Sequence, residues 1–211
     1  MTDIIKTAKA GTNADLFPDI LRLYVPEGSR VLDMTYGKGV FWKKVDTSKY
    51  QLDTNDISED RGDSHYDFRN IPVADASYDA AILDPPYMFI HRPSGGGRIK
   101  ASIDKGYGNN ARYDQGDGGP DKVRSYYIDG AREALRLLVV KGTLIVKCMD
   151  QVFSGKQWWE HIFLYDAITQ LGYHMIDLFV LVQSGTPTMR HKHQVHARKN
   201  HSYFLVFRKP K

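Results

Sequence analysis

The chain has 211 residues and a formal net charge of +4; 42% of its residues are hydrophobic and 26% are charged. These values are ordinary for a soluble globular protein, and the length suits a single domain, 1–211, with a substantial core. No apolar run reaches the roughly 18 residues of a membrane span, the N-terminus lacks a signal-peptide pattern, and a lone cysteine excludes an internal disulfide. We therefore expect a cytoplasmic protein without membrane contact.

The positive charge is concentrated towards the C-terminus. No Asp or Glu follows Asp177, whereas basic residues continue to the end of the chain. Such a segment suits a polyanion, although a solvated surface would have the same composition. The basic residues after Asp177 are Arg190, Lys192, Arg198, Lys199, Arg208, Lys209 and Lys211.

The first third of the chain contains a glycine-rich turn between an expected strand and an expected helix. We expect an irregular arm over 1–13, a helix over 14–24 capped by Asn13, and a strand over 29–33. Gly37 and Gly39 then let the backbone approach a ligand, and the stretch opens a helix whose amino end favours negative groups. Position 42 is Trp rather than the third glycine of a dinucleotide site, which disfavours nicotinamide and flavin cofactors.

Acidic residues follow the next expected strand, 51–55. An acid at such a strand end can accept both hydroxyls of a ribose, and Asp56 lies nearest to the expected end, ahead of Asp53 and Asp60. Alternatively, Asp56 is the N-cap of the following segment. Further on, Asp67 and Phe68 place a carboxylate and a ring where they could hold an adenine amino group and face.

The most informative stretch is an apolar run, 78–83, that ends in Asp-Pro-Pro-Tyr. The run has the length and composition of a buried parallel strand, and two prolines stop it abruptly. The resulting rigid corner offers a carboxylate, a proline carbonyl and an aromatic face at the ligand-binding end of an open α/β sheet. This set suits an exocyclic amino group on a flat base. The alternative is a proline turn with a capping Asp.

A long segment, 88–122, follows the corner and is rich in glycine and basic residues. A loop of this length is functional or disordered, and beside the corner we favour a lid that orders on the substrate. Beyond it we expect a helix over 122–139, a strand over 142–147, a helix over 157–171, and two strands, 175–182 and 202–208. The loop between the last two strands holds several histidines, but phosphate contacts by its basic residues are favoured over a metal site. The expected nucleic-acid-binding residues are Arg92, Arg98, Lys100, Arg190, Lys192, Arg198 and Lys199.

These elements, in this order, resemble the S-adenosylmethionine-dependent amino-methyltransferases, which methylate exocyclic nitrogens of nucleic-acid bases. The resemblance covers most of residues 8–208 and includes the tetrapeptide at 84–87 without change. It implies an α/β, Rossmann-like class I methyltransferase fold, with a seven-stranded, mostly parallel sheet and an antiparallel edge hairpin. S-adenosyl-L-methionine is the implied cofactor, and no metal is implied.

The resemblance also assigns roles to individual residues. It implies a catalytic group of Asp84, Pro85, Pro86 and Tyr87. It implies a cofactor-binding group of Thr12, Asp33, Tyr36, Gly37, Gly39, Asp56, Ile57, Asp67 and Phe68. One departure concerns positions 34–35, where Met-Thr replaces the usual Pro-Phe, so cofactor packing there is expected to differ.

The leading Asp of the tetrapeptide implies adenine N6 in DNA as the target. An RNA base, at guanine N2 or adenine N6, is the first alternative, and a non-catalytic nucleic-acid-binding subunit is the second. DNA members usually carry a target-recognition domain, and this chain has no room for a separate one. The missing domain strengthens the RNA alternative, but because of the leading Asp we expect DNA more than RNA as the partner, with a separate specificity subunit or a homodimer as a further candidate partner.

Overall fold

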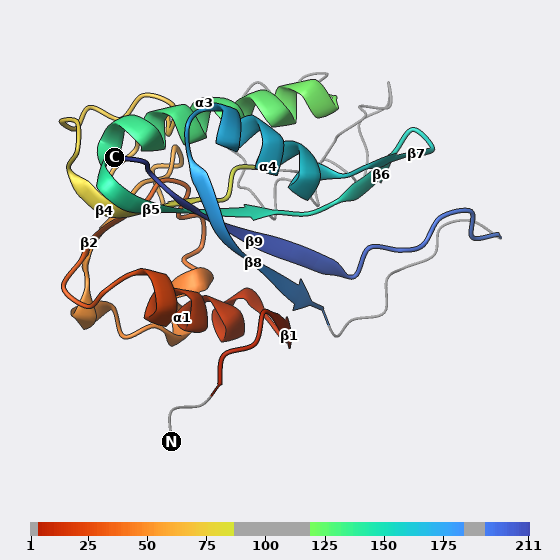
Figure 1. Cartoon of the computed structure of the whole chain (residues 1–211), viewed down its shortest axis with the longest axis horizontal. Coiled ribbons are helices and arrows are strands. Elements are labelled where there is room, and N and C mark those ends of the chain that lie inside the picture. Colours follow the sequence, from red (N-terminus) through yellow and green to blue (C-terminus); the bar gives the residue numbers. More distant parts are fainter. Residues whose placement is uncertain (1–3, 87–118, 184–192) are drawn as a thin grey trace.

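The computed structural model describes residues 4–86, 119–183 and 193–211 as an α/β fold built on one large sheet (Figure 1). The strands of this sheet lie in the order β1-β8-β9-β5-β4-β2-β3. They are β1 (Ala8–Ala10), β2 (Arg30–Asp33), β3 (Gln51–Thr54), β4 (Tyr78–Leu83), β5 (Leu138–Cys148), β8 (His174–Val182) and β9 (His201–Arg208). The other elements are α1 (Asn13–Tyr24), η1 (Phe41–Lys44), η2 (Thr47–Lys49), α3 (Pro120–Leu137), β6 (Gln151–Phe153), β7 (Lys156–Trp158) and α4 (Glu160–Gln170).

The expected fold class is confirmed. Strands β3, β2, β4 and β5 are parallel to one another, whereas β9 runs antiparallel to both β5 and β8. The large sheet has seven strands in the described part of the chain. Of the helices in that part, none is long and apolar enough to cross a membrane.

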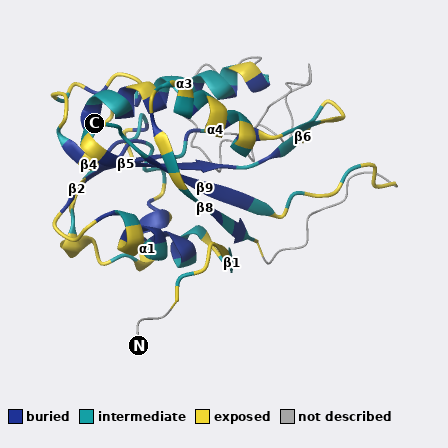
Figure 2. Ribbon diagram, in the orientation of Figure 1, coloured by how far each residue is buried: buried dark blue, intermediate teal, exposed yellow. Residues whose placement is uncertain are grey.

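Two layers of helix bury the two faces of the sheet, and β4 supplies side chains to both. Ala80 and Ile82 pack with α1, while Ala81 and Leu83 pack with α3 and α4, as the two-residue period of a strand requires. Figure 1 shows α1 on one side of the sheet and α3 with α4 on the other. The central strands are accordingly the most continuously buried part of the molecule (Figure 2). Burial on both faces explains why β4 reads as an uninterrupted apolar run.

Three local expectations were wrong. The arm over 1–13 is not irregular throughout, because Ala8–Ala10 pairs in parallel with Val180–Val182 and adds a strand outside the antiparallel pair. The glycine turn leads into a single 3-10 turn, Phe41–Lys44, rather than a helix. The helix expected over 157–171 begins only at Glu160, because Lys156–Trp158 pairs with β6.

The predicted lid over 88–122 lies outside the described residues except for its last four positions. Gly119 is the N-cap of α3, and Pro120 occupies its first turn, where the missing N–H of proline is tolerated. Helix α3 then runs back along β4 at close range. A Cβ added at Gly130 would come within 2.8 Å of Leu83 Cδ1, so this contact requires glycine.

Candidate active site

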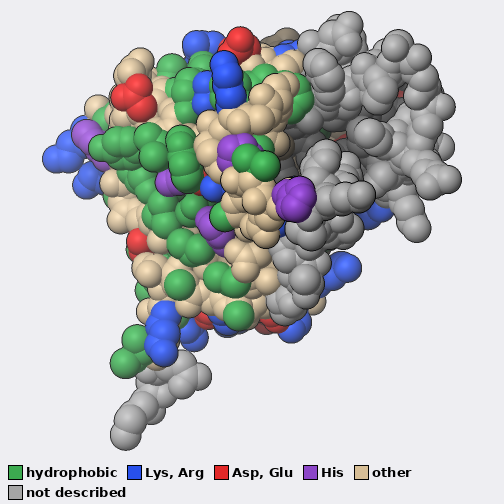
Figure 3. Space-filling model, turned by 90° about the vertical axis from the view of Figure 1, so that its right-hand side faces the viewer, with side chains coloured by type: hydrophobic (Ala, Val, Ile, Leu, Met, Phe, Trp, Pro, Cys, Tyr) green, Lys and Arg blue, Asp and Glu red, His purple; other side chains and the backbone are tan. Residues whose placement is uncertain are grey.

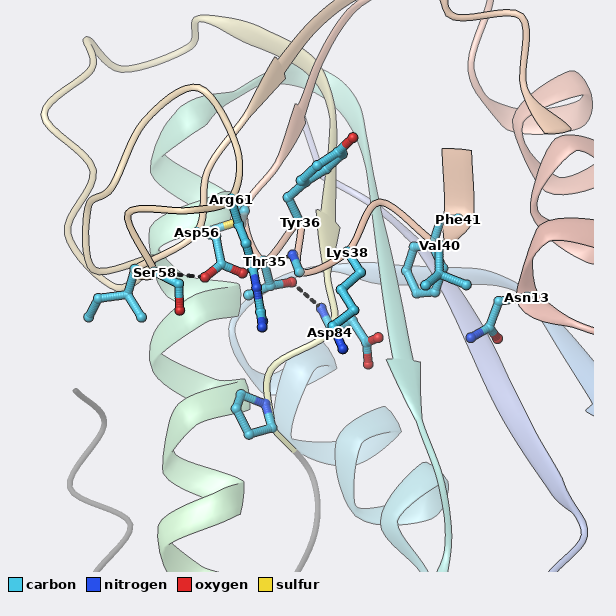
Figure 4. Close-up of a pocket in the computed structure, with 14 residues that line it drawn as sticks. Asn13, Thr35, Tyr36, Lys38, Val40, Phe41, Asp56, Ser58, Arg61 and Asp84 are labelled. Atoms are coloured by element: carbon cyan, nitrogen blue, oxygen red, sulfur yellow. Dashed lines mark hydrogen bonds between the residues drawn. The ribbon is translucent and has the colours of Figure 1, made fainter. Parts of the chain in front are cut away.

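The loops at the carboxyl ends of β2, β3 and β4 enclose a cavity of about 190 Å³. It is lined by the turn after β2, the loop after β3, the corner after β4 and the first residue of α1 (Figure 4). Among the expected site residues, those lining it are Tyr36, Gly37, Asp56, Ile57, Asp84 and Pro86. This is the edge at which open parallel sheets bind ligands.

The turn after β2 is held in a shape that only glycine adopts easily. Gly37 and Gly39 have φ angles of 58° and 62°, in the left-handed region. A Cβ at Gly39 would also lie 2.5 Å from the hydroxyl oxygen of Tyr36, so a side chain there would displace the tyrosine. The glycines thus shape the floor of the cavity, and Gly39 does so from behind Tyr36.

Asp56 joins the turn to the loop after β3. Its Oδ2 accepts the Gly37 N–H at 2.8 Å, and its Oδ1 accepts the Ser58 N–H at 2.9 Å. The carboxylate lies at the cavity wall, with lone pairs left for a ligand. The competing acids lie elsewhere: Asp53 pairs with Arg30 at 2.9 Å, and Asp60 does not line the cavity.

Asp33 acts behind the turn rather than in the cavity. Its buried carboxyl accepts the Trp42 indole N–H at 2.7 Å and the Thr35 N–H at 3.2 Å. Burial raises the pKa of Asp33 to about 7, although the two donors act in the opposite direction. Through Trp42, this carboxyl fixes where the chain leaves the glycine turn.

The corner after β4 presents an acceptor without a partner. The Asp84 N–H donates to Thr35 Oγ1 at 2.7 Å, which ties the corner to the glycine turn. Asp84 Oδ1 is buried and accepts no hydrogen bond in the described structure, and the same holds for the side-chain oxygen of Asn13. Both residues line the cavity (Figure 4), so two acceptors without a hydrogen-bond partner belong to its lining.

Charged neighbours act on Asp84 in opposite directions. Burial of the carboxyl raises the pKa of Asp84, Lys147 on the adjacent strand lowers it, and Asp33 raises it further. The balance makes this carboxyl a stronger base than an exposed one. The Asp84 carboxyl therefore changes its ionisation around neutral pH.

Some expected site residues lie away from the cavity. Thr12 is the N-cap of α1 and bonds Asp15 through its backbone N–H and its hydroxyl. Phe68 is buried in the core against Tyr126, and Asp67 pairs with Arg69. The expected residues that lie outside the described part of the chain are Tyr87, Arg92, Arg98, Lys100, Arg190 and Lys192.

Eight residues that line the cavity were not among the expected site residues: Asn13, Met34, Thr35, Lys38, Val40, Phe41, Ser58 and Arg61. Asn13 had been assigned only a capping role, and it reaches the cavity because β1 pairs with β8 and fixes the start of α1. The positions of Lys38 and Arg61 depend on loop conformation, for which periodicity gives no signal. In the described residues, no group of three His, Cys, Asp or Glu side chains is placed to hold a metal ion.

Comparisons with known proteins support the fold assignment. No protein-family model and no curated protein sequence matches the chain. A SAM-dependent methyltransferase from Methanosarcina mazei superposes with a TM-score of 0.54 and 10% identity, over 90% of this chain and 97% of that one. The N-methyltransferase NodS from Bradyrhizobium japonicum gives 0.54 and 10%, over 93% and 96%.

The same fold also carries other chemistry. The [4+2]-cyclase SpnF superposes with a TM-score of 0.55 and 16% identity, over 93% of this chain and 82% of that one. The chain therefore has the class I fold of SAM-dependent methyltransferases. Because likeness at such low identity shows the fold alone, the reaction has to be argued from the residues of the site.

Proposed function

We propose that this protein is a SAM-dependent methyltransferase that methylates an exocyclic amino group of a nucleic-acid base, with adenine N6 in DNA as the first candidate. The observation that carries the proposal is the buried, unpartnered Oδ1 of Asp84 in the same cavity as the glycine turn. An amino group that donates to this oxygen would satisfy it. The nitrogen of that amino group would then face the ligand bound at the glycine turn.

The cavity has the donors and acceptors that S-adenosyl-L-methionine needs. Asp56 stands at the end of β3, where its remaining lone pairs can accept the ribose hydroxyls, with Ile57 beside it. The unpartnered Asn13 oxygen is suited to the amino group of the methionine portion. When bound, this cofactor supplies a methyl group already activated by a sulfonium centre.

The corner residues act on the acceptor amine. Asp84 and a carbonyl of Pro85 or Pro86 would accept its two hydrogens, which directs the nitrogen lone pair out of the base plane and towards the methyl carbon. Asp84 would take the proton that the nitrogen releases when it gains the methyl group. Fixed acceptors also stabilise the positive charge that develops on nitrogen. Tyr87 is proposed to stack on the base, by analogy with aromatic platforms for single strands.

An RNA base is the second candidate, because amino-methyltransferases of RNA share the corner tetrapeptide. In either case Arg198 and Lys199 are proposed to contact phosphates, which positions the substrate without reading its sequence. A separate specificity subunit or a second copy of the chain would supply target selection. A purely non-catalytic role is disfavoured because both the acid and the aromatic of the corner are present.

The test is transfer of a tritiated methyl group from S-adenosyl-L-methionine to duplex DNA, single-stranded DNA and RNA. Label should appear in one class and disappear when the matching nuclease is added before the methyl donor. Asp84→Ala should abolish transfer while leaving cofactor binding, measured by calorimetry, largely unchanged. Transfer by Asp84→Ala at a near wild-type rate would show that Asp84 has no catalytic role. Absence of cofactor binding by the wild-type chain would contradict the whole proposal.

A further inference from the structure

Lys147 is a buried lysine next to the proposed acceptor corner. It lies on β5 with 3% of its surface exposed, whereas lysines are almost never fully buried unless a partner compensates their charge. The parallel register pairs Leu83 of β4 with Val146 of β5. Lys147 therefore occupies the position alongside Asp84, one residue further towards the cavity edge.

Among the described residues, no acidic side chain contacts Lys147 directly. Its Nζ donates to Ser202 Oγ at 2.5 Å and lies 4.2 Å from the centre of the Phe204 ring, both on β9. Tyr127 of α3 contacts only the backbone, by donating its hydroxyl to the Lys147 carbonyl at 2.8 Å. A hydroxyl and a ring solvate an ammonium group but leave its charge without a counterion.

Burial lowers the pKa of Lys147 to about 8, and the carboxyl of Asp84 opposes this shift electrostatically, although no ion pair within 4.0 Å joins these two described side chains. The electrostatic neighbours of Lys147 are Asp84 and the thiol of Cys148, and burial keeps that thiol neutral by raising its pKa. The charged groups that act on Asp84 are Lys147 and, from β2, Asp33, which favours the protonated form. Lys147 is therefore the described cation that lowers the pKa of Asp84, whereas burial and Asp33 raise it.

We propose that Lys147 is a positioning residue that keeps Asp84 ionised. Both carboxylate oxygens of Asp84 then remain acceptors for the substrate amine. A protonated Asp84 would present a donor to the amine and could not receive the proton released on methyl transfer. Lys147 acts through Asp84 and is placed behind it rather than against the substrate. This inference deepens the proposed function, on which its catalytic meaning rests.

The direct test is titration of the Asp84 carboxyl by NMR in protein labelled with carbon-13 at the aspartate side chain. The Asp84 signal is assigned by its loss in Asp84→Asn. In Lys147→Met, which removes the charge but keeps the length of the side chain, the Asp84 midpoint should rise by at least about one pH unit, a tenfold change in its ionisation constant. An unchanged midpoint in folded Lys147→Met would overturn the proposal.

Two further variants separate charge from packing. Lys147→Arg retains a cation and should keep the midpoint close to wild type, whereas Lys147→Gln is neutral and should behave as Lys147→Met; it replaces that variant if the methionine protein does not fold. Folding is checked by cofactor binding and thermal melting. Because the titration needs no substrate, it succeeds or fails independently of methyl transfer. If transfer is observed, Lys147→Met should move the acid limb of its pH profile to higher pH.

Discussion

At the scale of single residues, Asp33 couples stability to pH. Its folded pKa of about 7 is raised by burial above the ordinary value of 3.8, so the folded state binds the proton more tightly. The contribution of Asp33 to stability is therefore present at low pH and is lost as pH rises towards and through 7. In Asp33→Asn, the neutral amide keeps an oxygen for the Trp42 N–H but does not ionise.

The loss of unfolding free energy caused by Asp33→Asn should therefore be larger near pH 5 than near pH 8, by about 1.4 kcal/mol for each pH unit between 5 and the folded pKa of Asp33, or roughly 2–3 kcal/mol. Urea denaturation of both proteins at the two pH values measures this difference. Taking the difference between variant and wild type removes the titration of other groups. An equal loss at both pH values would show that the folded pKa of Asp33 is ordinary.

Thr35 is the residue through which the turn holds the corner. Its hydroxyl accepts the Asp84 N–H at 2.7 Å. Thr35→Val keeps the shape but leaves that N–H without an acceptor, at a cost of about 1–3 kcal/mol. We expect methyl transfer to fall about tenfold or more, because Asp84 loses its position, while cofactor affinity changes little.

Thr35→Ser is the matched control for this prediction, since it retains the hydroxyl and should retain most of the activity. Steady-state kinetics of the two variants, with calorimetry of cofactor binding, make the comparison. Equal losses in the serine and valine variants would contradict the prediction, because the serine variant retains the hydroxyl that accepts the Asp84 N–H.

At the scale of elements, the glycine turn is rigid because several groups define it at once. Gly39→Ala forces a side chain onto a residue at φ 62° and into Tyr36, whereas Gly155→Ala, in the β6–β7 hairpin, meets the same backbone strain at φ 72° with nothing within 4 Å. Both variants should lose about 1 kcal/mol of stability from strain. Only Gly39→Ala should weaken cofactor binding, by about tenfold or more, because Tyr36 lines the cavity. Calorimetry that finds equal affinity in both variants would contradict a role for the turn in cofactor binding.

The elements that could be predicted are those whose own residues carry the pattern, without help from distant parts of the chain. Strand β4 could be read from its apolar run because both of its faces are buried, and Asp84 and Asp56 could be placed because strand ends fix them. Strand β1 could not, because it is three residues long and exists only through pairing with β8 at the other end of the chain. The presence of Asn13 in the cavity follows from that pairing, so it was equally hidden.

The chain after Gly39 shows a second kind of limit. Its composition permits a helix, but Phe41 and Trp42 are buried against Phe17 of α1, and the Trp42 indole is held by Asp33. These contacts stabilise a short 3-10 turn at 41–44 relative to a longer α-helix. Similarly, Phe68 was expected to contact a ligand, but a tertiary contact with α3 takes it into the core. Local patterns do not reveal such long-range competition.

At the scale of the whole molecule, the proposed chemistry and the proposed substrate surface share one edge of the sheet. The β6–β7 hairpin and residues 193–200 extend side by side beyond the carboxyl end of β5 (Figure 1). Figure 3 looks onto this edge, where hydrophobic and histidine side chains are interspersed and acidic side chains lie towards the margins of the visible face. Trp159 is 48% exposed, and the Lys199 ammonium lies 4.2 Å from its ring centre. A flat ring beside a cation suits a base and its phosphate.

If this surface binds phosphates, the affinity for the nucleic acid that accepts the methyl group should depend on salt concentration. Replacing Arg198 and Lys199 by Ala should weaken nucleic-acid binding and reduce the slope of log affinity against log salt by up to about 1.8, since each lost phosphate contact releases roughly one fewer counterion. The charge-matched control is Arg22→Ala with Lys49→Ala, whose side chains belong to the last turn of α1 and to η2, directly before β3. Fluorescence anisotropy over a series of salt concentrations measures both slopes. If the two double variants reduce the slope equally, net charge rather than this surface controls binding.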